Sequence, residues 1–540
     1  MRWVRRGVIG LLASAAVAWG AGAAPAAASI GPQPVGSVSW TTYHDTPAGT
    51  GVDGQAGGVD TSTRAWVSPS LDGQLYGEPL VYGDRVYVAT ENDTVYALSA
   101  GNGAVVWSMH LGTPVPARSL PCGDISPTAG ITGTPVIDTA RSEIFAVADL
   151  YVGGKPAHTL FGLSLASGKV ELREDVDPPG VNTAALLQRT GLALDDGQVV
   201  FGMGGNDGDC AAYRGRVIAV PEAGGTPRIF TVDAAPGDSQ GAVWMGGAAP
   251  VIDAHGDIWV STGNGSVYSS KDAYDDSDAV LELSPSLRLL QFFAPSSWPA
   301  NNAADLDMST APMLLPSGQV VLAGKSRIVY LLNGAHLGGI GGQEATLSGR
   351  MQSANVGTVC ANDIDGGAAT SGMTVYLPCT SGIVAVRATA SPPALHVLWS
   401  SEVGGGPPII AGGLVWTIGQ NGVLYGLDAA TGKVRQQVTI GVPANHFPTP
   451  SVGDGLLLAT CATNVAAFHA SAQSASPGAG VATTGHSACQ AYSAPASPGP
   501  GTPRSVMAGI AAGGLAVICV AFWAFWSVRR RRVIRGAWRA

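Results

Sequence analysis

Residues 95–107 read VYALSAGNGAVVW, and residues 424–436 read LYGLDAATGKVRQ, far downstream in the 540-residue chain. Both stretches join an apolar run to a second strand-forming run through a polar turn that ends in glycine, at Gly103 and Gly432. Short alternating runs bounded by such turns are typical of β-hairpins, and the glycine supplies the positive φ that a tight turn requires. The stretch is therefore one copy of a hairpin unit.

The same unit recurs through most of the chain. Aligned on its apolar core, it occurs in eight copies that begin at Val95, Leu160, Val217, Val280, Val329, Ile383, Leu424 and Val465. Most copies follow a small-Pro-apolar step and another strand, as in TPVIDTARSEIFAVA and APVIDAHGDIWVSTGN. The spacing between the first residues of consecutive copies is typical of solenoids and propellers. Three or four short strands in each such period make a propeller blade. We expect an all-β, eight-bladed β-propeller over residues 29–470.

The two ends of the repeat array predict how the ring closes. The last copy has no fourth strand after it, whereas residues 64–70 (RAWVSPS) form a strand-like run before the first copy. A blade has two apolar faces that only its neighbours can cover, and an unpaired strand edge invites aggregation. We therefore expect this N-terminal strand to pair with the last blade. An open β-solenoid, the alternative, would lack that pairing.

Both termini of the chain lie outside the repeats. Residues 1–28 combine early arginines, an apolar run and the sequence AAA at 26–28, which predicts a secretory signal peptide. Residues 506–528 carry no charge, which is about enough for a transmembrane helix across ~30 Å of hydrocarbon. The arginine-rich residues 529–540 would stay cytoplasmic, and the Ser/Ala/Gly/Pro-rich residues 471–505 are typical of a flexible stalk. The pattern predicts a single-pass cell-membrane protein with its propeller outside.

Composition limits partners and suggests disulfides. Acidic residues outnumber basic ones by 38 to 29, and several arginines lie in the two ends, so the exterior repels phosphate backbones and nucleic acid is not expected as a partner. One of the seven cysteines lies in the predicted span and six lie outside it, an even number typical of an exported domain. Spacing leaves the pairing open, and we favour nearest neighbours: Cys122–Cys210, Cys360–Cys379 and Cys461–Cys489.

A known family is recognisable at this point. The sequence DAATGK at 428–433 resembles the repeat of pyrroloquinoline quinone (PQQ) enzymes, and WTTYHDTPAGTG at 40–51 resembles their entry segment. The docking Trp of that repeat is present at Trp107 and Trp399 and is replaced elsewhere, for example by Leu172. The resemblance, over roughly residues 38–470, implies the propeller but not the activity, because fold and function are separable and many PQQ-like propellers carry no quinone.

The resemblance also implies a set of site residues. In quinoprotein dehydrogenases a Trp floors the quinone, an Asn and an acid bind Ca²⁺, an Asp acts as the base, and a Lys or Arg contacts the quinone oxygens. Ca²⁺ then polarises the quinone while a carboxylate takes a proton from an alcohol or sugar. The corresponding residues here are Asp209 and Asn264 for the metal, Trp244 and Lys325 for the cofactor, and Asp305 or Asp307 for catalysis.

The chain departs from the family pattern in two respects. The adjacent Cys–Cys pair is absent, and the segment matching the calcium-binding Glu reads GGNDGDCAAYRG, with Cys210 at the position of the acid and Asp209 beside it. We therefore expect a membrane-tethered, non-catalytic binding or scaffold module without a cofactor, whose unknown protein or small-molecule ligand binds in the funnel or on the propeller face. The alternative is a PQQ- and Ca²⁺-dependent alcohol or sugar dehydrogenase.

Overall fold

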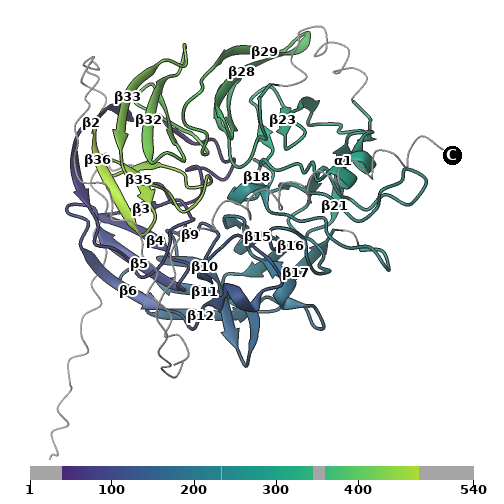
Figure 1. Ribbon diagram of the computed structural model, residues 1–540, viewed down its shortest axis with the longest axis horizontal. Helices are drawn as coiled ribbons and strands as arrows, with labels where there is room; N and C mark the ends of the chain where they lie inside the picture. Colours follow the sequence, from purple (N-terminus) through teal and green to yellow (C-terminus); the bar gives the residue numbers. More distant parts are fainter. Residues whose placement is uncertain (1–38, 233, 344–358, 473–540) are drawn as a thin grey trace, which may run out of the picture. The chain divides into compact units, whose positions relative to one another are not determined.

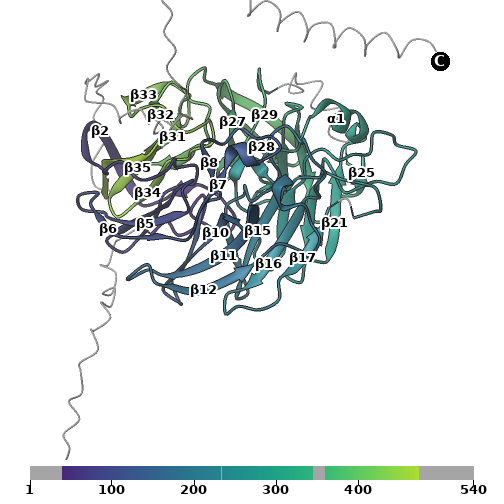
Figure 2. The same ribbon diagram turned by 60° about the horizontal axis from the view of Figure 1, so that its bottom comes forward.

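The computed structural model describes residues 39–232, 234–343 and 359–472. Eight of the nine small β-sheets in these ranges are arranged as blades around a central axis (Figure 1). The ninth pairs β7 (Val115–Pro116) with β8 (Thr128–Ala129) in the connection from blade 1 to blade 2. In both views the outer strands β6, β12 and β17 lie at the rim (Figures 1 and 2). The predicted eight-bladed propeller is confirmed.

The blades are numbered in chain order. Blade 1 contains β3 (Leu80–Tyr82), β4 (Arg85–Ala89), β5 (Thr94–Ser99) and β6 (Val105–His110). Blade 2 contains β9 (Val136–Asp138), β10 (Glu143–Val152), β11 (Lys155–Ser164) and β12 (Val170–Asp175). Blade 3 contains β13 (Leu186–Leu187), β14 (Ala193–Asp195), β15 (Gln198–Gly205), β16 (Arg216–Pro221) and β17 (Arg228–Thr231). Blade 4 contains β18 (Val251–Ile252), β19 (Ile258–Ser261), β20 (Val280–Leu283) and β21 (Leu289–Ala294), extended by β25 (Gly339–Ile340).

The second half of the ring follows the same plan. Blade 5 contains β22 (Met313–Leu314), β23 (Gln319–Ala323) and β24 (Val329–Asn333). Blade 6 contains β26 (Ala369–Ser371), β27 (Thr374–Cys379), β28 (Gly382–Ala390) and β29 (Pro393–Ser400). Blade 7 contains β30 (Ile409–Ala411), β31 (Leu414–Ile418), β32 (Val423–Asp428) and β33 (Val434–Thr439), with β1 (Val52–Asp53) at its inner edge. Blade 8 contains β34 (Ser451–Gly453), β35 (Leu456–Cys461), β36 (Asn464–Ala472) and β2 (Ala56–Val67).

Each repeat found in the sequence corresponds to the third strand of a blade. Val95 lies in β5, Val280 begins β20 and Val465 lies in β36. Blade 5 departs from the four-stranded plan, because its described strands number three and β25, which follows them, pairs in parallel with β21 of blade 4 instead. Blade 5 thus fits the prediction of three or four strands in each period, whereas blade 3 has five described strands because β13 and β14 both pair with β15.

The N-terminal strand closes the ring. Strand β2 pairs antiparallel with β36, with Arg64 opposite Phe468 and Trp66 opposite Ala467. Figure 1 shows these two strands side by side, although they come from opposite ends of the propeller sequence. The last blade thus obtains its fourth strand from the start of the chain, as the sequence predicts, and neither end of the array is left with an open edge.

A tryptophan on the fourth strand fastens one blade to the next. The Trp107 indole N–H of blade 1 donates to the Leu165 carbonyl of blade 2 at 3.0 Å, and its ring lies where a Cβ on Gly168 would come within 2.5 Å of it. Trp399 repeats the arrangement against Gly432. Position 168 must therefore be glycine for two reasons, its φ of +70° and the ring against it.

The entry segment, residues 40–51, passes along the inner strands of the ring. Its carbonyl groups accept hydrogen bonds from the backbones of blades 1, 2, 4, 6 and 7, and the chain then continues as β1 and β2. The backbone donor and acceptor pairs are Val81 to Trp40, Ile137 to Thr41, Ile252 to Pro47, Thr370 to Thr50 and Ile410 to Gly51.

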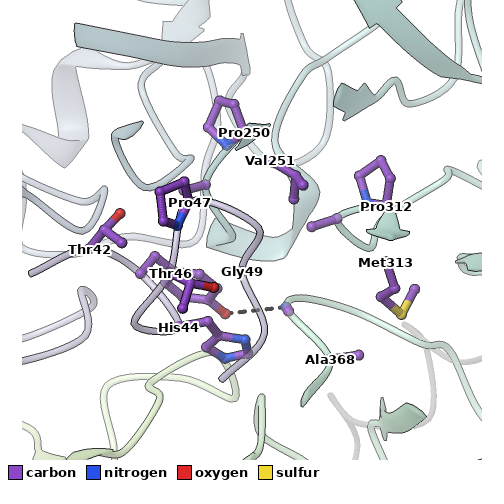
Figure 3. Close-up of a pocket in the computed structure, with 14 residues that line it drawn as sticks. Thr42, His44, Thr46, Pro47, Gly49, Pro250, Val251, Pro312, Met313 and Ala368 are labelled. Carbon is purple, nitrogen blue, oxygen red and sulfur yellow. Dashed lines mark hydrogen bonds between the residues drawn. The ribbon is translucent and has the colours of Figure 1, made fainter. Parts of the chain in front are cut away.

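Side chains of the entry segment are buried at the centre. The Gly367 N–H donates to the Tyr43 hydroxyl at 3.2 Å, and the His44 backbone N–H donates to the Glu78 carboxylate at 2.7 Å. Figure 3 shows a small cavity between this segment and the small-Pro-apolar steps of blades 4 and 5. Pro250, Val251, Pro312 and Met313 of those steps line the cavity together with the entry segment.

Several predictions concern residues that the structure does not describe. They are the signal peptide (1–28), most of the stalk (471–505), the transmembrane helix (506–528), the basic tail (529–540) and Cys489, the predicted partner of Cys461. Within the described ranges, no helix is long and apolar enough to span a membrane.

Candidate functional site

The six residues implied by the resemblance lie on one face of the propeller. In an antiparallel blade the second-to-third strand turns and the connections to the next blade share a face, because strand direction alternates. Asp209, Asn264 and Lys325 follow second strands (β15, β19 and β23). Trp244 precedes β18, and Asp305 and Asp307 lie between α1 (Trp298–Ala304) and β22, in connections between blades.

Lys325 is the centre of this group. Its Nζ lies 2.6 Å from Asp307 Oδ2 and 3.0 Å from Asp305 Oδ1, and it is 5.4 Å from the centroid of the Trp244 ring. Burial disfavours the charge on Lys325, but the two carboxylates outweigh it and raise its pKa above the ordinary value. Lys325 is therefore a fixed cation over an aromatic face.

Asp307 ties blade 4 to blade 5. The Asn264 backbone N–H donates to its Oδ1 at 2.6 Å, while its Oδ2 binds Lys325. A Cβ on Gly263 would come within 2.7 Å of the same Oδ1, so only glycine allows this approach. Burial raises the pKa of Asp307, and Lys325 offsets the effect only in part.

Asp305 differs from Asp307 although both contact the same ammonium. It caps α1 with a left-handed backbone, φ 57° and ψ 50°, and its side chain is 67% exposed against 5% for Asp307. A carboxylate that must take a proton from a substrate has to be reachable. Asp305 meets this condition, whereas Asp307 is enclosed by its partners.

Trp244 contacts both Lys325 and Phe447, a residue of the connection between blades 7 and 8. The Phe447 ring meets the indole edge-on with centroids 6.0 Å apart, so two different connections border the Trp244 ring. The backbone after the tryptophan turns sharply at Gly246 and Gly247, with φ of 58° and 90°. A Cβ on Gly246 would come within 2.3 Å of the Gly366 nitrogen of blade 6, which explains the glycine.

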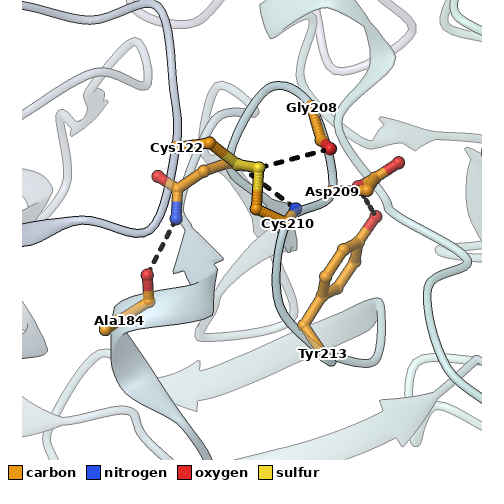
Figure 4. Close-up of a disulfide and its surroundings, with 7 residues drawn as sticks. Cys122, Ala184, Gly208, Asp209, Cys210 and Tyr213 are labelled. Atoms are coloured by element: carbon orange, nitrogen blue, oxygen red, sulfur yellow. Dashed lines mark hydrogen bonds between the residues drawn. A yellow bond between two sulfur atoms is a disulfide. The ribbon is translucent and has the colours of Figure 1, made fainter.

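Asp209 and Asn264 lie beside each other at the blade 3 side of the group. Asp209 Oδ1 accepts a hydrogen bond from the Tyr213 hydroxyl at 2.8 Å, and the Asn264 side chain also hydrogen-bonds its carboxylate. Burial raises the pKa of Asp209, and Tyr213 lowers it in part. The neighbouring Cys210 forms the predicted disulfide with Cys122, which fixes this loop to the connection after blade 1 (Figure 4).

The predicted disulfides are confirmed where the structure describes both cysteines. Cys122 pairs with Cys210 and Cys360 pairs with Cys379, with Cα atoms 5.9 and 5.7 Å apart. The second disulfide joins the connection after blade 5 to the second strand of blade 6. The first disulfide therefore joins the connection between blades 1 and 2 to blade 3, and the second joins the connection between blades 5 and 6 to blade 6.

Sequence reasoning missed Phe447 and Tyr213 as members of this site. Phe447 lies in the connection from β33 to β34, and Tyr213 in the loop from β15 to β16, where no repeat position marks them. One signal was available, because every connection between blades reaches the same face and an aromatic residue in such a connection is a candidate for the centre.

The side chains at this site are of the types that would bind Ca²⁺ and PQQ, the metal and cofactor implied by the resemblance. Carboxylate and amide oxygens, as on Asp209 and Asn264, are what Ca²⁺ prefers, and a Trp face beside a Lys ammonium suits a planar, electron-poor ring with oxygens. Among the described residues, no three acidic, histidine or cysteine ligand atoms lie within 4.8 Å of one another at this site. Within the described ranges, the group whose three donor atoms lie within 4.8 Å of one another is Asp253, His255 and Asp257, in the β18–β19 turn.

Comparisons with known proteins agree with the fold. Residues 50–273 match a PQQ-type repeat family model described as outer membrane protein assembly factor BamB. Among curated proteins, no sequence matches this chain significantly.

Solved structures give the same result. A quinohemoprotein alcohol dehydrogenase from Pseudomonas putida HK5 superposes with a TM-score of 0.60 at 13% identity, over 81% of each chain. That from Comamonas testosteroni gives 0.59 at 14%, over 83% of this chain and 82% of its own. A europium-containing methanol dehydrogenase gives 0.54 at 15%, over 79% and 90%. At these identities the likeness shows the fold.

Proposed function

Because the chain carries the PQQ-like β-propeller repeat, we propose that it is a quinoprotein-type dehydrogenase that oxidises an alcohol or sugar. The observation that carries the proposal is the convergence of Trp244, Asn264, Asp307 and Lys325, from blades 4 and 5, within hydrogen-bonding or ring contact of one another. A scaffold that had lost its site would not need to keep these four residues together. The alcohol and methanol dehydrogenases among the similar structures share the fold on which these residues lie.

Each side chain has a separate task in this proposal. Asp305 is exposed and accepts the proton of the substrate hydroxyl. Lys325 holds Asp305 in place, and its ammonium would contact the oxygens of a quinone bound beside Trp244. Asp307 fixes the position of Lys325 and of the Asn264 backbone, which keeps the site rigid without taking part in proton transfer.

The cofactor and metal would be held by residues on both sides of Lys325. PQQ would lie against Trp244 and Lys325, and Ca²⁺ would bind the Asn264 amide oxygen and Asp209. When bound, the quinone accepts a hydride equivalent, which is chemistry that no side chain of the protein supplies. The side chains of this chain bind, orient and remove the proton.

The experiment uses the full-length protein incubated with PQQ and CaCl₂. We expect quenching of tryptophan fluorescence on PQQ binding and reduction of an artificial dye with primary alcohols or aldoses. Asp305→Asn should keep the quenching and lose about 10²- to 10⁴-fold in dye reduction. Dye reduction that is unaffected by this substitution would reject Asp305 as the base.

A second candidate is a binding module without catalysis, as the departures from the family pattern indicate. One observation favours it: both carboxylate oxygens of Asp307 are already satisfied by the protein itself, through Asn264 and Lys325. PQQ or another planar ligand would quench the tryptophan fluorescence of such a module, and no substrate would give dye reduction. In either case we propose that the propeller lies outside the cell and is tethered by the predicted span at residues 506–528.

A further inference from the structure

Arg189 is a buried cation near the proposed site. It lies between β13 and β14 of blade 3 and is 6% exposed. Its guanidinium lies 4.6 Å from the centroid of the Phe447 ring and 5.9 Å from that of Tyr76. A Cβ on Gly247 would come within 2.3 Å of its Nη1, so the turn that follows Trp244 leaves room for this side chain only because residue 247 is glycine.

The charge of Arg189 has no close partner. Within the described residues, no carboxylate lies within 4.0 Å of it, and its Nη2 is buried without a hydrogen-bond partner. Burying a guanidinium without a partner is costly, because water no longer solvates it. Cation–π contacts with two rings recover only part of this cost.

Glu91 does not remove the imbalance. Its charge interacts with Arg189 at longer range, as does that of Asp124. Burial raises the pKa of Glu91 to about 8, so this carboxyl is mainly neutral at pH 7 and contributes little negative charge. Its Oε1 is also buried without a partner in the described part of the chain. The region therefore holds an unpaired donor on Arg189 and an unpaired carboxyl oxygen on Glu91.

We propose that Arg189 is the anchor for the carboxylate of a small molecule that binds in this region. A planar guanidinium matches a carboxylate through two parallel hydrogen bonds. Phe447 connects this position to the site described above, because its ring contacts both Arg189 and Trp244. The anchored carboxylate belongs either to an organic-acid substrate or to the quinone, which is itself a tricarboxylate. In the first case the substrate is a hydroxy acid rather than a neutral alcohol.

The inference rests on the proposed function where it identifies the ligand as the substrate or the quinone, whereas the binding of a carboxylate by Arg189 does not depend on that function. It also predicts an effect on stability that a structural arginine would not produce. Removing a purely structural buried arginine lowers the unfolding temperature, whereas removing a cation that awaits its ligand leaves the unliganded protein as stable as before or more so.

The test compares Arg189→Gln and Arg189→Lys with Arg216→Gln in the full-length protein. Arg216, on β16, is a matched control because it is also buried, at 7% exposure, but donates to the Arg214 carbonyl. Binding is measured by calorimetry with lactate, with propane-1,2-diol as its uncharged analogue, and with PQQ. Thermal unfolding without ligand is recorded for every variant.

We expect lactate or PQQ to bind the wild type and to bind Arg189→Gln about 10- to 100-fold more weakly, as for a lost hydrogen bond to a charged group. Arg189→Lys keeps the charge without the planar fork and should bind with intermediate affinity. Loss with lactate assigns the carboxylate to the substrate, and loss with PQQ alone assigns it to the cofactor. Propane-1,2-diol should not distinguish the variants.

Three outcomes would overturn the proposal: no binding of either acid by the wild type, equal affinity in Arg189→Gln, or a larger drop in unfolding temperature for Arg189→Gln than for Arg216→Gln. Failure of the proposed function gives a different result. If lactate binding depends on Arg189 while PQQ and CaCl₂ produce no dye reduction, the anion site stands and the dehydrogenase does not.

Discussion

Lys325 Nζ lies 2.6 Å from Asp307 Oδ2, and Asp307 is enclosed so completely that 5% of its side chain remains exposed. Removing Lys325 leaves Asp307 buried without its cation, and removing Asp307 leaves Lys325 with Asp305 alone. Breaking a buried ion pair from one side typically costs about 3–5 kcal/mol. Lys325 retains Asp305 as a second partner, so the lower end of that range applies.

The first prediction contrasts the two acids that contact Lys325. Asp307→Asn should lower the free energy of unfolding by about 3 kcal/mol, because it breaks the Lys325 pair and disturbs the Asn264 hydrogen bond. Asp305→Asn should change it by less than about 1 kcal/mol, as for an exposed pair. Urea unfolding of both variants measures the difference. Equal destabilisation by the two would contradict the division into a buried support and an exposed base.

The second prediction concerns the contact between blades 1 and 2. Gly168→Ala should lower the free energy of unfolding by about 2–4 kcal/mol, because alanine is strained at a positive φ and its Cβ would clash with the Trp107 ring. Gly153→Ala is the matched control, since Gly153 has a φ of +59° and open space around it. It should cost about 1 kcal/mol. An equal loss of unfolding free energy in both variants would show that the Trp107 ring does not restrict residue 168.

The third prediction concerns the two described disulfides. Cys122 and Cys210 are separated by 88 residues, and Cys360 and Cys379 by 19. Loop closure predicts contributions of about 4–5 and about 3 kcal/mol, with measured values often smaller. Only the first pair adjoins Asp209, so Cys122→Ser with Cys210→Ser should also weaken Ca²⁺-dependent PQQ binding. Fluorescence titration of both double variants tests this, and equal binding would separate the disulfide from the site.

Much of the fold could be predicted from the sequence because a blade is a local structure. The strand period, the turn glycines and the small-Pro-apolar steps are all fixed within one repeat, so Val95 and Val465 could be assigned to equivalent strands. Ring closure was also predictable, because the last blade lacks a fourth strand and the strand near Arg64 has no blade of its own, so the two can pair. The fourth-strand Trp66 was not recognised as a docking residue, yet it contacts Gly103 as Trp107 contacts Gly168.

The candidate site was predictable only where it follows the repeat. Asn264 and Lys325 occupy equivalent turns after second strands, so a resemblance in order along the chain sufficed to group them. Phe447 and Arg189 reach the same region through connections and inner strand ends whose paths depend on the closed ring. The different exposure of Asp305 and Asp307 likewise depends on the left-handed residue that ends α1, which no local pattern in the sequence specifies.

The last prediction concerns the pH dependence of stability, through a histidine buried between two carboxylates. His158 Nδ1 lies 2.8 Å from Asp177 Oδ1, and Nε2 lies 3.5 Å from Asp149 Oδ1. Burial lowers the pKa of His158, but Asp149 and Asp177 outweigh it and raise the value to about 9. A folded pKa above the ordinary value of 6.5 stabilises the fold fully below pH 6.5, and this contribution is lost as the pH rises to 9. The loss amounts to about 3 kcal/mol.

Urea unfolding at pH 6.5 and pH 9 measures this loss. The free energy of unfolding should decline more steeply for the wild type than for His158→Gln, whereas the exposed His336→Gln should follow the wild type. Parallel declines in all three proteins would mean that His158 does not gain its proton on folding.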